Sequence, residues 1–350
     1  MRHMREPIWL MLLLGGVCLG SSLLCAAAVG DAGTAAHAAA LIVVNQGDLN
    51  ISVVDPVAAR EIATISEDQT TVHGHEAATS ADGRIAYVPI YGNVGVGQPG
   101  LDGHEMLAID IASRKIVGRV DFGHGVRPHC VVYEPVSGML YVTTELDNSV
   151  TVVDPRTLKI VGAIATTQAE SHMLAISHDG RRGYTANVGP GTVSVLDMTA
   201  RKTIVVIPIS GDTQRISISN DDSMVFTADQ TKPQLAVIDT STNKVKAWVA
   251  LPSFGYGTAA TRDGKWLLVA MPHGGQAAVV DLATLKVART IDLPGAPQEV
   301  VVRPDGKVAY VSCIRAGQVG QVAVIDLAQW KVQSLIDAGK GADGLAWAGR

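Results

Sequence analysis

A short strand pattern ending in aspartate recurs seven times along this chain of 350 residues. The segments ISVVD, MLAID, VTVVD, VSVLD, LAVID, AAVVD and VAVID end at Asp55, Asp110, Asp154, Asp197, Asp239, Asp281 and Asp326. Successive aspartates are 55, 44, 43, 42, 42 and 45 residues apart. This period is typical of a propeller blade, a four-stranded antiparallel unit that cannot bury its faces alone and stacks on its neighbours. The repeat therefore predicts an all-β, seven-bladed β-propeller.

The two ends of the repeat region predict how the ring closes. Asp-Gly pairs such as Asp179-Gly180 precede an apolar strand in most repeats, which is typical of a hairpin inside each blade. The first repeat begins at LIVVNQ (41–46) and lacks its innermost strand, whereas the chain ends with one spare strand, GLAWAG (344–349). We therefore expect one C-terminal strand to join three N-terminal strands, which leaves no open blade edge.

The strands YVPI, YVTT and YVSC, each followed by a loop and a V-x-V-I-D-like strand, resemble the YVTN-repeat β-propeller family. The resemblance covers residues 41–349 and implies a seven-bladed propeller. More distantly, such repeats are similar to the haem-carrying propeller domain of periplasmic nitrite reductases and to bacterial lactonase propellers. The site motif of the lactonases has no match here, and a fold does not fix a function.

The first 28 residues are typical of an export signal. Arg2 and Arg5 precede an apolar run from Ile8 to Leu24, and three alanines follow at 26–28. We expect residues 1–28 to be a signal peptide, 29–40 a flexible linker and 41–350 the propeller, located in the periplasm or secreted. An uncleaved anchor is the alternative, because 17 apolar residues approach spanning length.

Charge, hydropathy and cysteine content limit the possible binding partners and the possible state of the thiols. The net charge of -5, without a basic run, excludes a nucleic-acid binder. No segment after residue 28 is apolar enough to span a membrane, so we expect the mature form to have no membrane span. We also expect it to be a monomer. Only Cys130 and Cys313 lie after residue 28, and we expect both to be free and buried.

Histidines gather on one predicted face of the ring. We call the face with the Asp-Gly turns and the turns after the Asp-ended strands the bottom, and the opposite face the top. Counting seven residues back from each turn places one residue of each blade at the top rim of the central channel: His75, His129 (one residue further), His172, Gln214, Tyr256, Gln298 and Asp343. Three successive blades thus present imidazoles, which can bind a transition metal, ligate haem or transfer protons. The alternative is that these residues only solvate the rim or stabilise its loops.

The long first spacing comes from an insertion at residues 91–104, which we expect to form a flap over the channel mouth. His104 and Glu105 end this flap. Glu76 and Glu170 stand beside the rim histidines, and their carboxylates could orient the imidazoles of these histidines when the imidazoles bind a metal. The tryptophans after residue 28 fall in strand patterns, so we expect them to be packing residues and not a stacking platform.

Two classes of function remain open. The first is an exported binding or scaffold protein that holds a small ligand, a metal or a periplasmic protein partner at the channel mouth. The alternative is a haem- or metal-dependent periplasmic oxidoreductase or accessory protein that uses His75, His129 and His172. The first is favoured because no catalytic motif is present.

Overall fold

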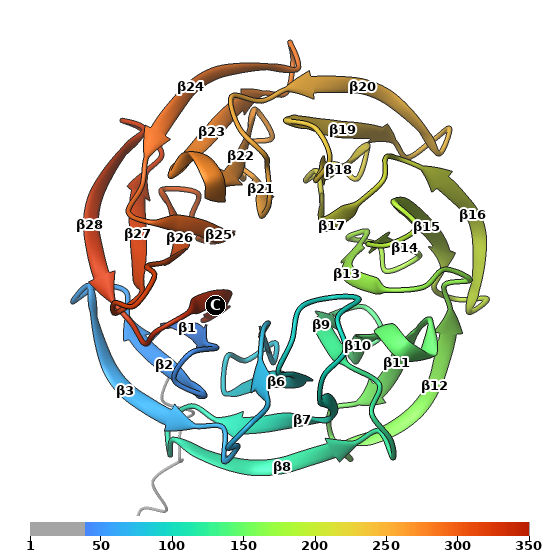
Figure 1. Cartoon of the computed structure of the whole chain (residues 1–350), viewed down its shortest axis with the longest axis vertical. Helices are drawn as coiled ribbons and strands as arrows, with labels where there is room; N and C mark the ends of the chain where they lie inside the picture. Colours follow the sequence, from blue (N-terminus) through green and yellow to red (C-terminus); the bar gives the residue numbers. More distant parts are fainter. Residues whose placement is uncertain (1–38, 350) are drawn as a thin grey trace, which may run out of the picture. The chain divides into compact units, whose positions relative to one another are not determined.

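Seven four-stranded antiparallel sheets stand around a central axis in a computed structural model that describes residues 39–349 (Figure 1). The all-β propeller predicted from the repeat is confirmed. In blades two to seven the innermost strand comes first, and the chain then moves outward strand by strand. The predicted signal peptide and nearly all of the predicted linker lie outside the described residues, and the first strand starts at Ala40.

The first blade closes the ring. It contains β1 (Ala40–Asn45), β2 (Asn50–Asp55) and β3 (Arg60–Ser66), and its innermost strand is β29 (Ala342–Ala348) from the C-terminus. Leu41 pairs with Trp347, and Val43 pairs with Leu345. The predicted closure is thus confirmed, and Figure 1 shows the two ends of the propeller side by side.

The second blade departs from the regular pattern because its innermost strand is broken into two short pieces. It contains β4 (His73–Gly74), β5 (Ala78–Thr79), β6 (Ile85–Gly92), β7 (Asp102–Asp110) and β8 (Lys115–Asp121). Both β4 and β5 pair with β6. The strands β6 and β7 extend into the 91–104 insertion, so this insertion is a long hairpin on the top face.

The other five blades follow one plan. Blade three has β9 (Pro128–Glu134), β10 (Met139–Thr144), β11 (Ser149–Asp154) and β12 (Lys159–Ala165). Blade four has β13 (Ser171–Ile176), β14 (Arg182–Asn187), β15 (Thr192–Asp197) and β16 (Lys202–Pro208). Blade five has β17 (Thr213–Ile218), β18 (Met224–Asp229), β19 (Gln234–Asp239) and β20 (Lys244–Ala250). Blade six has β21 (Thr258–Ala260), β22 (Trp266–Met271), β23 (Gln276–Asp281) and β24 (Lys286–Asp292). Blade seven has β25 (Ala296–Val302), β26 (Val308–Ile314), β27 (Gln321–Asp326) and β28 (Lys331–Asp337).

Helical structure in residues 39–349 consists of two three-residue 3₁₀ turns, η1 (Glu145–Asp147) and η2 (Pro272–Gly274). Neither is long or apolar enough to cross a membrane.

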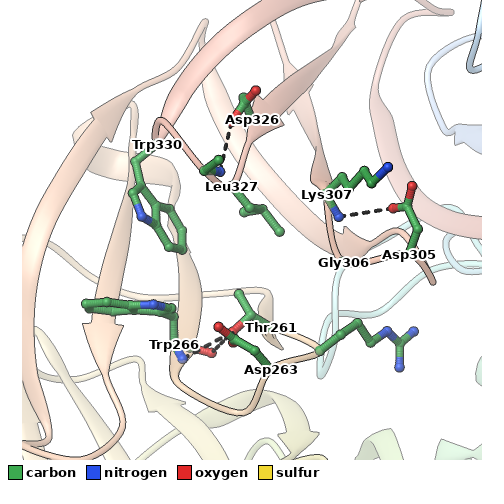
Figure 2. Close-up of a pocket in the computed structure, with 11 residues that line it drawn as sticks. Thr261, Asp263, Trp266, Asp305, Gly306, Lys307, Asp326, Leu327 and Trp330 are labelled. Atoms are coloured by element: carbon green, nitrogen blue, oxygen red, sulfur yellow. Dashed lines mark hydrogen bonds between the residues drawn. The ribbon is translucent and has the colours of Figure 1, made fainter.

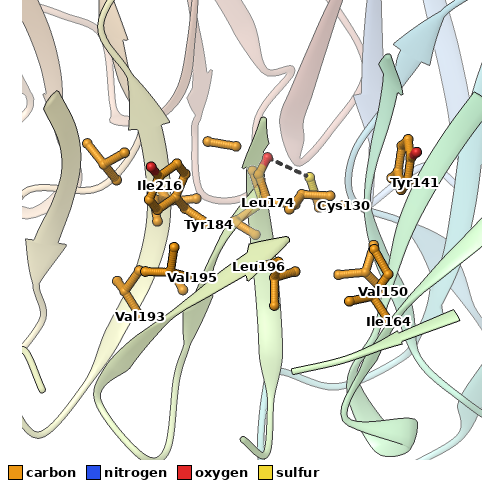
Figure 3. Close-up of a cluster of buried hydrophobic side chains, with 14 of the residues drawn as sticks. Cys130, Tyr141, Val150, Ile164, Leu174, Tyr184, Val193, Val195, Leu196 and Ile216 are labelled. Carbon is orange, nitrogen blue, oxygen red and sulfur yellow. Dashed lines mark hydrogen bonds between the residues drawn. The ribbon is translucent and has the colours of Figure 1, made fainter. Parts of the chain in front are cut away.

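The core lies between the blades, where the apolar faces of neighbouring sheets meet. One such cluster joins blades three, four and five through residues such as Val150, Leu174 and Ile216 (Figure 3). Cys130 belongs to it, and its Sγ is 3.8 Å from the carbonyl oxygen of Leu174. Cys130 and Cys313 are both free and buried, as the sequence predicts.

The aspartates that end the third strands stabilise the bottom turns. The side chain of Asp55, for example, accepts hydrogen bonds from the backbone amides of Val57 and Ala58 at 2.8 and 2.9 Å. The same Asx-type turn follows the third strand in every blade. The repeated aspartate is therefore a structural residue.

Candidate functional site

His75, His129 and His172 come together at the top of the channel. His75 lies between β4 and β5, His129 lies in β9 and His172 in β13. The ring centroids of His75 and His129 are 5.1 Å apart, and those of His129 and His172 are 3.5 Å apart. The shared register of three successive inner strands predicts this convergence. We call these three residues the imidazole cluster.

Two further rings complete the surroundings of the imidazole cluster. His73 stacks on His75 with the ring centroids 4.9 Å apart. The ring of Tyr91, at the end of β6, lies 4.6 Å from that of His75 and 5.2 Å from that of His129. Counting residues back from each turn selects only residues of the innermost strands. It therefore misses Tyr91, which lies in β6, the second strand of its blade, where the insertion lengthens that strand.

Two histidines of the cluster have unpartnered ring nitrogens. His129 is fully buried, and its ring approaches the backbone of His172, but neither ring nitrogen has a hydrogen-bond partner of ordinary geometry among residues 39–349. The Nε2 of His75 is also buried without a partner in this part of the chain. Burial, followed by the nearby histidines, holds the pKa of both side chains well below the usual value. Each ring is therefore neutral, and one of its nitrogens carries a free lone pair.

The third histidine is held by a carboxylate. Glu145, buried in η1, accepts a short hydrogen bond from Nδ1 of His172 through Oε1, and one of 2.8 Å from the Tyr91 hydroxyl through Oε2. Because Nδ1 is the donor, Nε2 of a neutral His172 carries the lone pair. Burial, followed by the Glu145 charge, raises the pKa of Tyr91, so this residue stays a hydrogen-bond donor. Glu145 is a functional candidate that the sequence count missed. In the sequence, the only indication of Glu145 is that an acidic residue directly follows the strand MLYVTT.

Arg215 forms a second polar centre in the channel. Its side chain is 1% exposed and pairs with Glu76, with Glu299 at 2.8 Å and with Asp343 at 3.1 Å. The guanidinium carbon lies 4.7 Å from the centroid of the Tyr256 ring. Residues from five blades thus meet at one buried cation, and we call this group the arginine centre.

The arginine centre carries more acid than base. Burial raises the pKa of Glu76 well above its usual value and that of Glu299 to about 7, while the Arg215 charge opposes both shifts. Burial also raises the pKa of Asp343. Asp343 links the two polar centres, because its Oδ2 lies 3.9 Å from Nδ1 of His75.

The predicted rim is correct for some blades and shifted by one residue in others. Asp343 and Tyr256 take part in the arginine centre, but Gln298 donates to the Ala296 carbonyl of its own strand, and Gln214 stays half-buried outside the centre. The neighbours Arg215 and Glu299 point into the channel instead. In these two blades a one-residue register shift lies between Thr213 and Ile216 and between Pro297 and Val300. The inner strands β9, β13 and β29 contain the same kind of shift and still present the predicted residue. The position that faces the channel within such a bulge therefore differs between blades, and a residue count cannot detect this.

The predicted supporting carboxylates have other partners. Glu76 pairs with Arg215, and Glu170 accepts the Gly189 amide at 2.7 Å. His104 lies 3.2 Å from Asp121, and Glu105 pairs with Arg119 at 2.7 Å, both on the β7–β8 side of the blade. None of the four hydrogen-bonds to the imidazole cluster. The role predicted for them belongs to Glu145, since η1 brings its carboxylate to His172.

The 91–104 hairpin is tied down next to the cluster. Arg127, two residues before His129, pairs with Asp102 at 2.6 Å and donates to the Gln98 carbonyl at 2.7 Å. A Cβ at Gly97 would lie 3.0 Å from the Glu170 carboxylate, so the hairpin reaches from blade two to blade four. This crossing covers the start of β9, which contributes to the complete burial of His129.

The donor set of the cluster is nitrogen, and the rings are packed against one another. Within residues 39–349 no group of three or more His, Cys, Asp or Glu side chains is placed to hold a metal ion. A metal ion bound by His75, His129 and His172 therefore stays a prediction, and it requires the rings to separate.

The fold and site define a seven-bladed propeller with neutral imidazoles and buried charges in its channel. Residues 134–262, which include His172 and Arg215, match the family model of the cytochrome D1 haem domain. The predicted similarity to the haem-carrying propeller domain is thereby confirmed. No curated protein matches the chain in sequence.

Two solved structures share the fold. Dihydro-haem d1 dehydrogenase NirN, in complex with DHE, has a TM-score of 0.62 and 16% identity over 87% of this chain and 74% of that one. Hydrazine synthase from Kuenenia stuttgartiensis has a TM-score of 0.55 and 22% identity over 61% of this chain. The match spans 66% of the hydrazine synthase chain. At these identities the likeness concerns the fold.

Proposed function

We propose that this chain is an exported propeller that binds a haem-type tetrapyrrole through the imidazole cluster at the top of its channel. The observation that carries the proposal is His129, a fully buried and neutral imidazole whose ring nitrogens have no hydrogen-bond partner of ordinary geometry in the described part of the chain. An unpartnered buried polar group is costly, and its presence suggests that another molecule satisfies it. The match to the cytochrome D1 haem domain supports a tetrapyrrole as that molecule.

The chemistry of the residues fits such a group. When bound, a haem-type iron takes an imidazole nitrogen as an axial ligand and supplies redox chemistry. His129 and His75 offer lone pairs from neutral rings, and Glu145 fixes the orientation of His172 by holding its Nδ1. A carboxylate in this position also makes the imidazole a stronger donor.

Access to the cluster requires the 91–104 hairpin to move. The rings of His129 and His172 are buried, and the hairpin is held near them by the contacts of Arg127 with Asp102 and Gln98. The hairpin is rich in glycine and lies on the top face, so it can move without unfolding a blade. We expect it to open for loading and to exclude water from the bound group afterwards.

Titration of the exported protein with hemin tests the proposal. We expect one equivalent to bind with a shifted Soret band, and any two of the substitutions His75→Ala, His129→Ala and His172→Ala to abolish the shift. His178→Ala is the matched control, because His178 lies in a bottom turn and pairs with Asp222 at 2.6 Å. Binding that is absent, or that is equal in the double variants and in the control, would overturn the proposal. Circular dichroism separates lost binding from lost folding.

A second candidate is a scaffold without a cofactor. The close packing of the cluster and the five-blade arginine centre favour this candidate, because both rigidify the ring without any ligand. It predicts that hemin leaves the thermal unfolding temperature unchanged, whereas a specific ligand raises that temperature.

A further inference from the structure

A groove opens on the bottom face, at the seam between blades six and seven. It has a volume of about 700 Å³ and is formed by the turns β21–β22, β25–β26 and β27–β28. This volume is within the range of small-molecule sites, roughly 300–1,000 Å³. The imidazole cluster lies at the opposite ends of the strands, in blades two to four. The groove is therefore separate from the site proposed above.

Two indole rings form one side of this groove. Trp266 begins β22, and Trp330 lies in the turn before β28, which corrects its expected place in a strand. Their ring centroids are 5.6 Å apart in an edge-to-face arrangement, and the Arg289 guanidinium lies 5.7 Å from the centroid of the Trp330 ring. Figure 2 shows both rings at one side of the groove and Asp305 and Lys307 at the other. Both indoles are half-buried, so part of each ring remains open to a ligand.

The other blades show that the seam does not need tryptophan at either position. The residues equivalent to Trp266 at the start of the second strand are Ala40, Ile85, Met139, Arg182, Met224 and Val308. The residues equivalent to Trp330 share its positive φ angle and are Ala59, Arg114, Leu158, Arg201, Asn243 and Leu285. A bulky residue is disfavoured at such an angle, and Trp330 adopts it at φ 58°. The paired indoles are thus a local addition to a blade that packs without them elsewhere.

The polar groups around the groove can donate and accept hydrogen bonds. Asp263 and Asp326 each use Oδ1 to hold a bottom turn, with contacts of 2.6 to 3.1 Å. Within residues 39–349 the Oδ2 atom of each has no hydrogen-bond partner. The ammonium of Lys307 and the guanidinium of Arg262 likewise form no hydrogen bond or ion pair in the described chain. The groove therefore offers free acceptors and free donors beside two aromatic faces.

The charges in the lining decide the class of ligand. Arg262 and Lys307 stand beside the carboxylates of Asp263 and Asp326, whereas Asp305 is already paired with Arg303 at 2.8 Å. The unpaired charges of the lining therefore balance, which favours a ligand without net charge. A pyranose ring has an apolar face that packs on an indole, and hydroxyls that both donate to carboxylates and accept from Lys or Arg. We propose that the groove between blades six and seven binds a neutral oligosaccharide, with its rings on Trp266 and Trp330.

The test is a titration of the exported protein with cellohexaose, maltohexaose and chitohexaose, followed by tryptophan fluorescence and calorimetry. We expect at least one of these probes to bind saturably. Trp330→Asn and Trp266→Met should weaken that binding at least tenfold. These substitutions are taken from the repeat itself, because Asn243 and two methionines occupy the equivalent positions, and the fold should therefore survive them.

Trp248→Ala is the matched control, because this indole is 41% exposed on the outer strand β20 and is not part of the groove. Its affinity should stay within twofold of the unchanged protein. The proposal is overturned if none of the three probes binds, or if the two groove variants bind as well as the Trp248→Ala control. Tighter binding of a sulfated oligosaccharide than of every neutral probe would overturn the neutral class.

Discussion

Replacing Arg215 by methionine removes the one buried cation that serves Glu76, Glu299 and Asp343. Removing one partner of a buried ion pair typically costs 3–5 kcal/mol, because the remaining charge stays buried without compensation. Methionine fills much of the volume of the arginine stem, so the charge dominates the loss. We expect the free energy of unfolding to fall by about 4 kcal/mol at pH 7.

The fall in the free energy of unfolding caused by Arg215→Met should be larger at high pH than at low pH. Without Arg215 the pKa values of the three carboxyls, already raised by burial, rise further in the folded state. A folded protein that binds more protons than the unfolded chain gains stability as the pH falls towards the ordinary carboxyl pKa. The loss at pH 5 should therefore be smaller than at pH 8 by at least about 1.4 kcal/mol, the equivalent of one pKa unit for one group.

Urea unfolding at pH 5 and pH 8 measures both effects. Arg182→Met is the matched control, because Arg182 is exposed at the start of β14, where two other blades carry methionine. The control should change the free energy of unfolding by less than about 0.5 kcal/mol. If Arg215→Met is as stable as the control, or if its loss is equal at both pH values, the arginine centre does not stabilise the fold as argued.

Three further predictions concern other parts of the propeller. Deleting residues 342–350 removes β29 from the first blade and exposes β1, so cooperative urea unfolding should be lost, and a deletion variant with the original transition would contradict the closure. Burial raises the pKa of Glu67 from 4.5 to about 7, so the unfolded chain releases this proton at lower pH than the folded protein does. The resulting loss of stability grows from about pH 4.5 to pH 7 and reaches about 3 kcal/mol, so Glu67→Gln should gain stability over the unchanged protein between pH 5 and pH 8. An advantage that does not grow over this range would refute the shift. Cys130 and Cys313 should react with a thiol reagent only after unfolding, and rapid labelling of the native protein would show that their burial is wrong.

Some of the site follows from the sequence and some does not. His75, His129 and His172 are predictable because they occupy the same position of the repeat, at the start of three successive inner strands. Glu145 and Tyr91 are not, because they reach the cluster from a 3₁₀ turn and from a strand that the insertion lengthens. Their spacing in the chain carries no sign of this contact.

The repeat by itself determines the seven blades and their closure. Each period of about 43 residues carries a complete four-stranded pattern, and one spare strand at the C-terminus matches one missing strand at the N-terminus. These features are local or periodic, so a sequence expresses them directly. The Asp-ended strands belong to the same class, because an Asx turn involves residues two or three positions apart.

Only the tertiary structure decides which polar residues face the channel and which indoles line a groove. Arg215 and Glu299 lie in the channel in place of the glutamines beside them, within one-residue register shifts of β17 and β25. The same kind of shift in β9, β13 and β29 leaves the predicted residue at the rim. Trp266 and Trp330 are 64 residues apart in sequence and meet only because the faces of adjacent blades pack against each other. The physical reason is the same in both cases: a one-residue bulge and an inter-blade contact depend on the packing of whole sheets, which the repeat period does not encode.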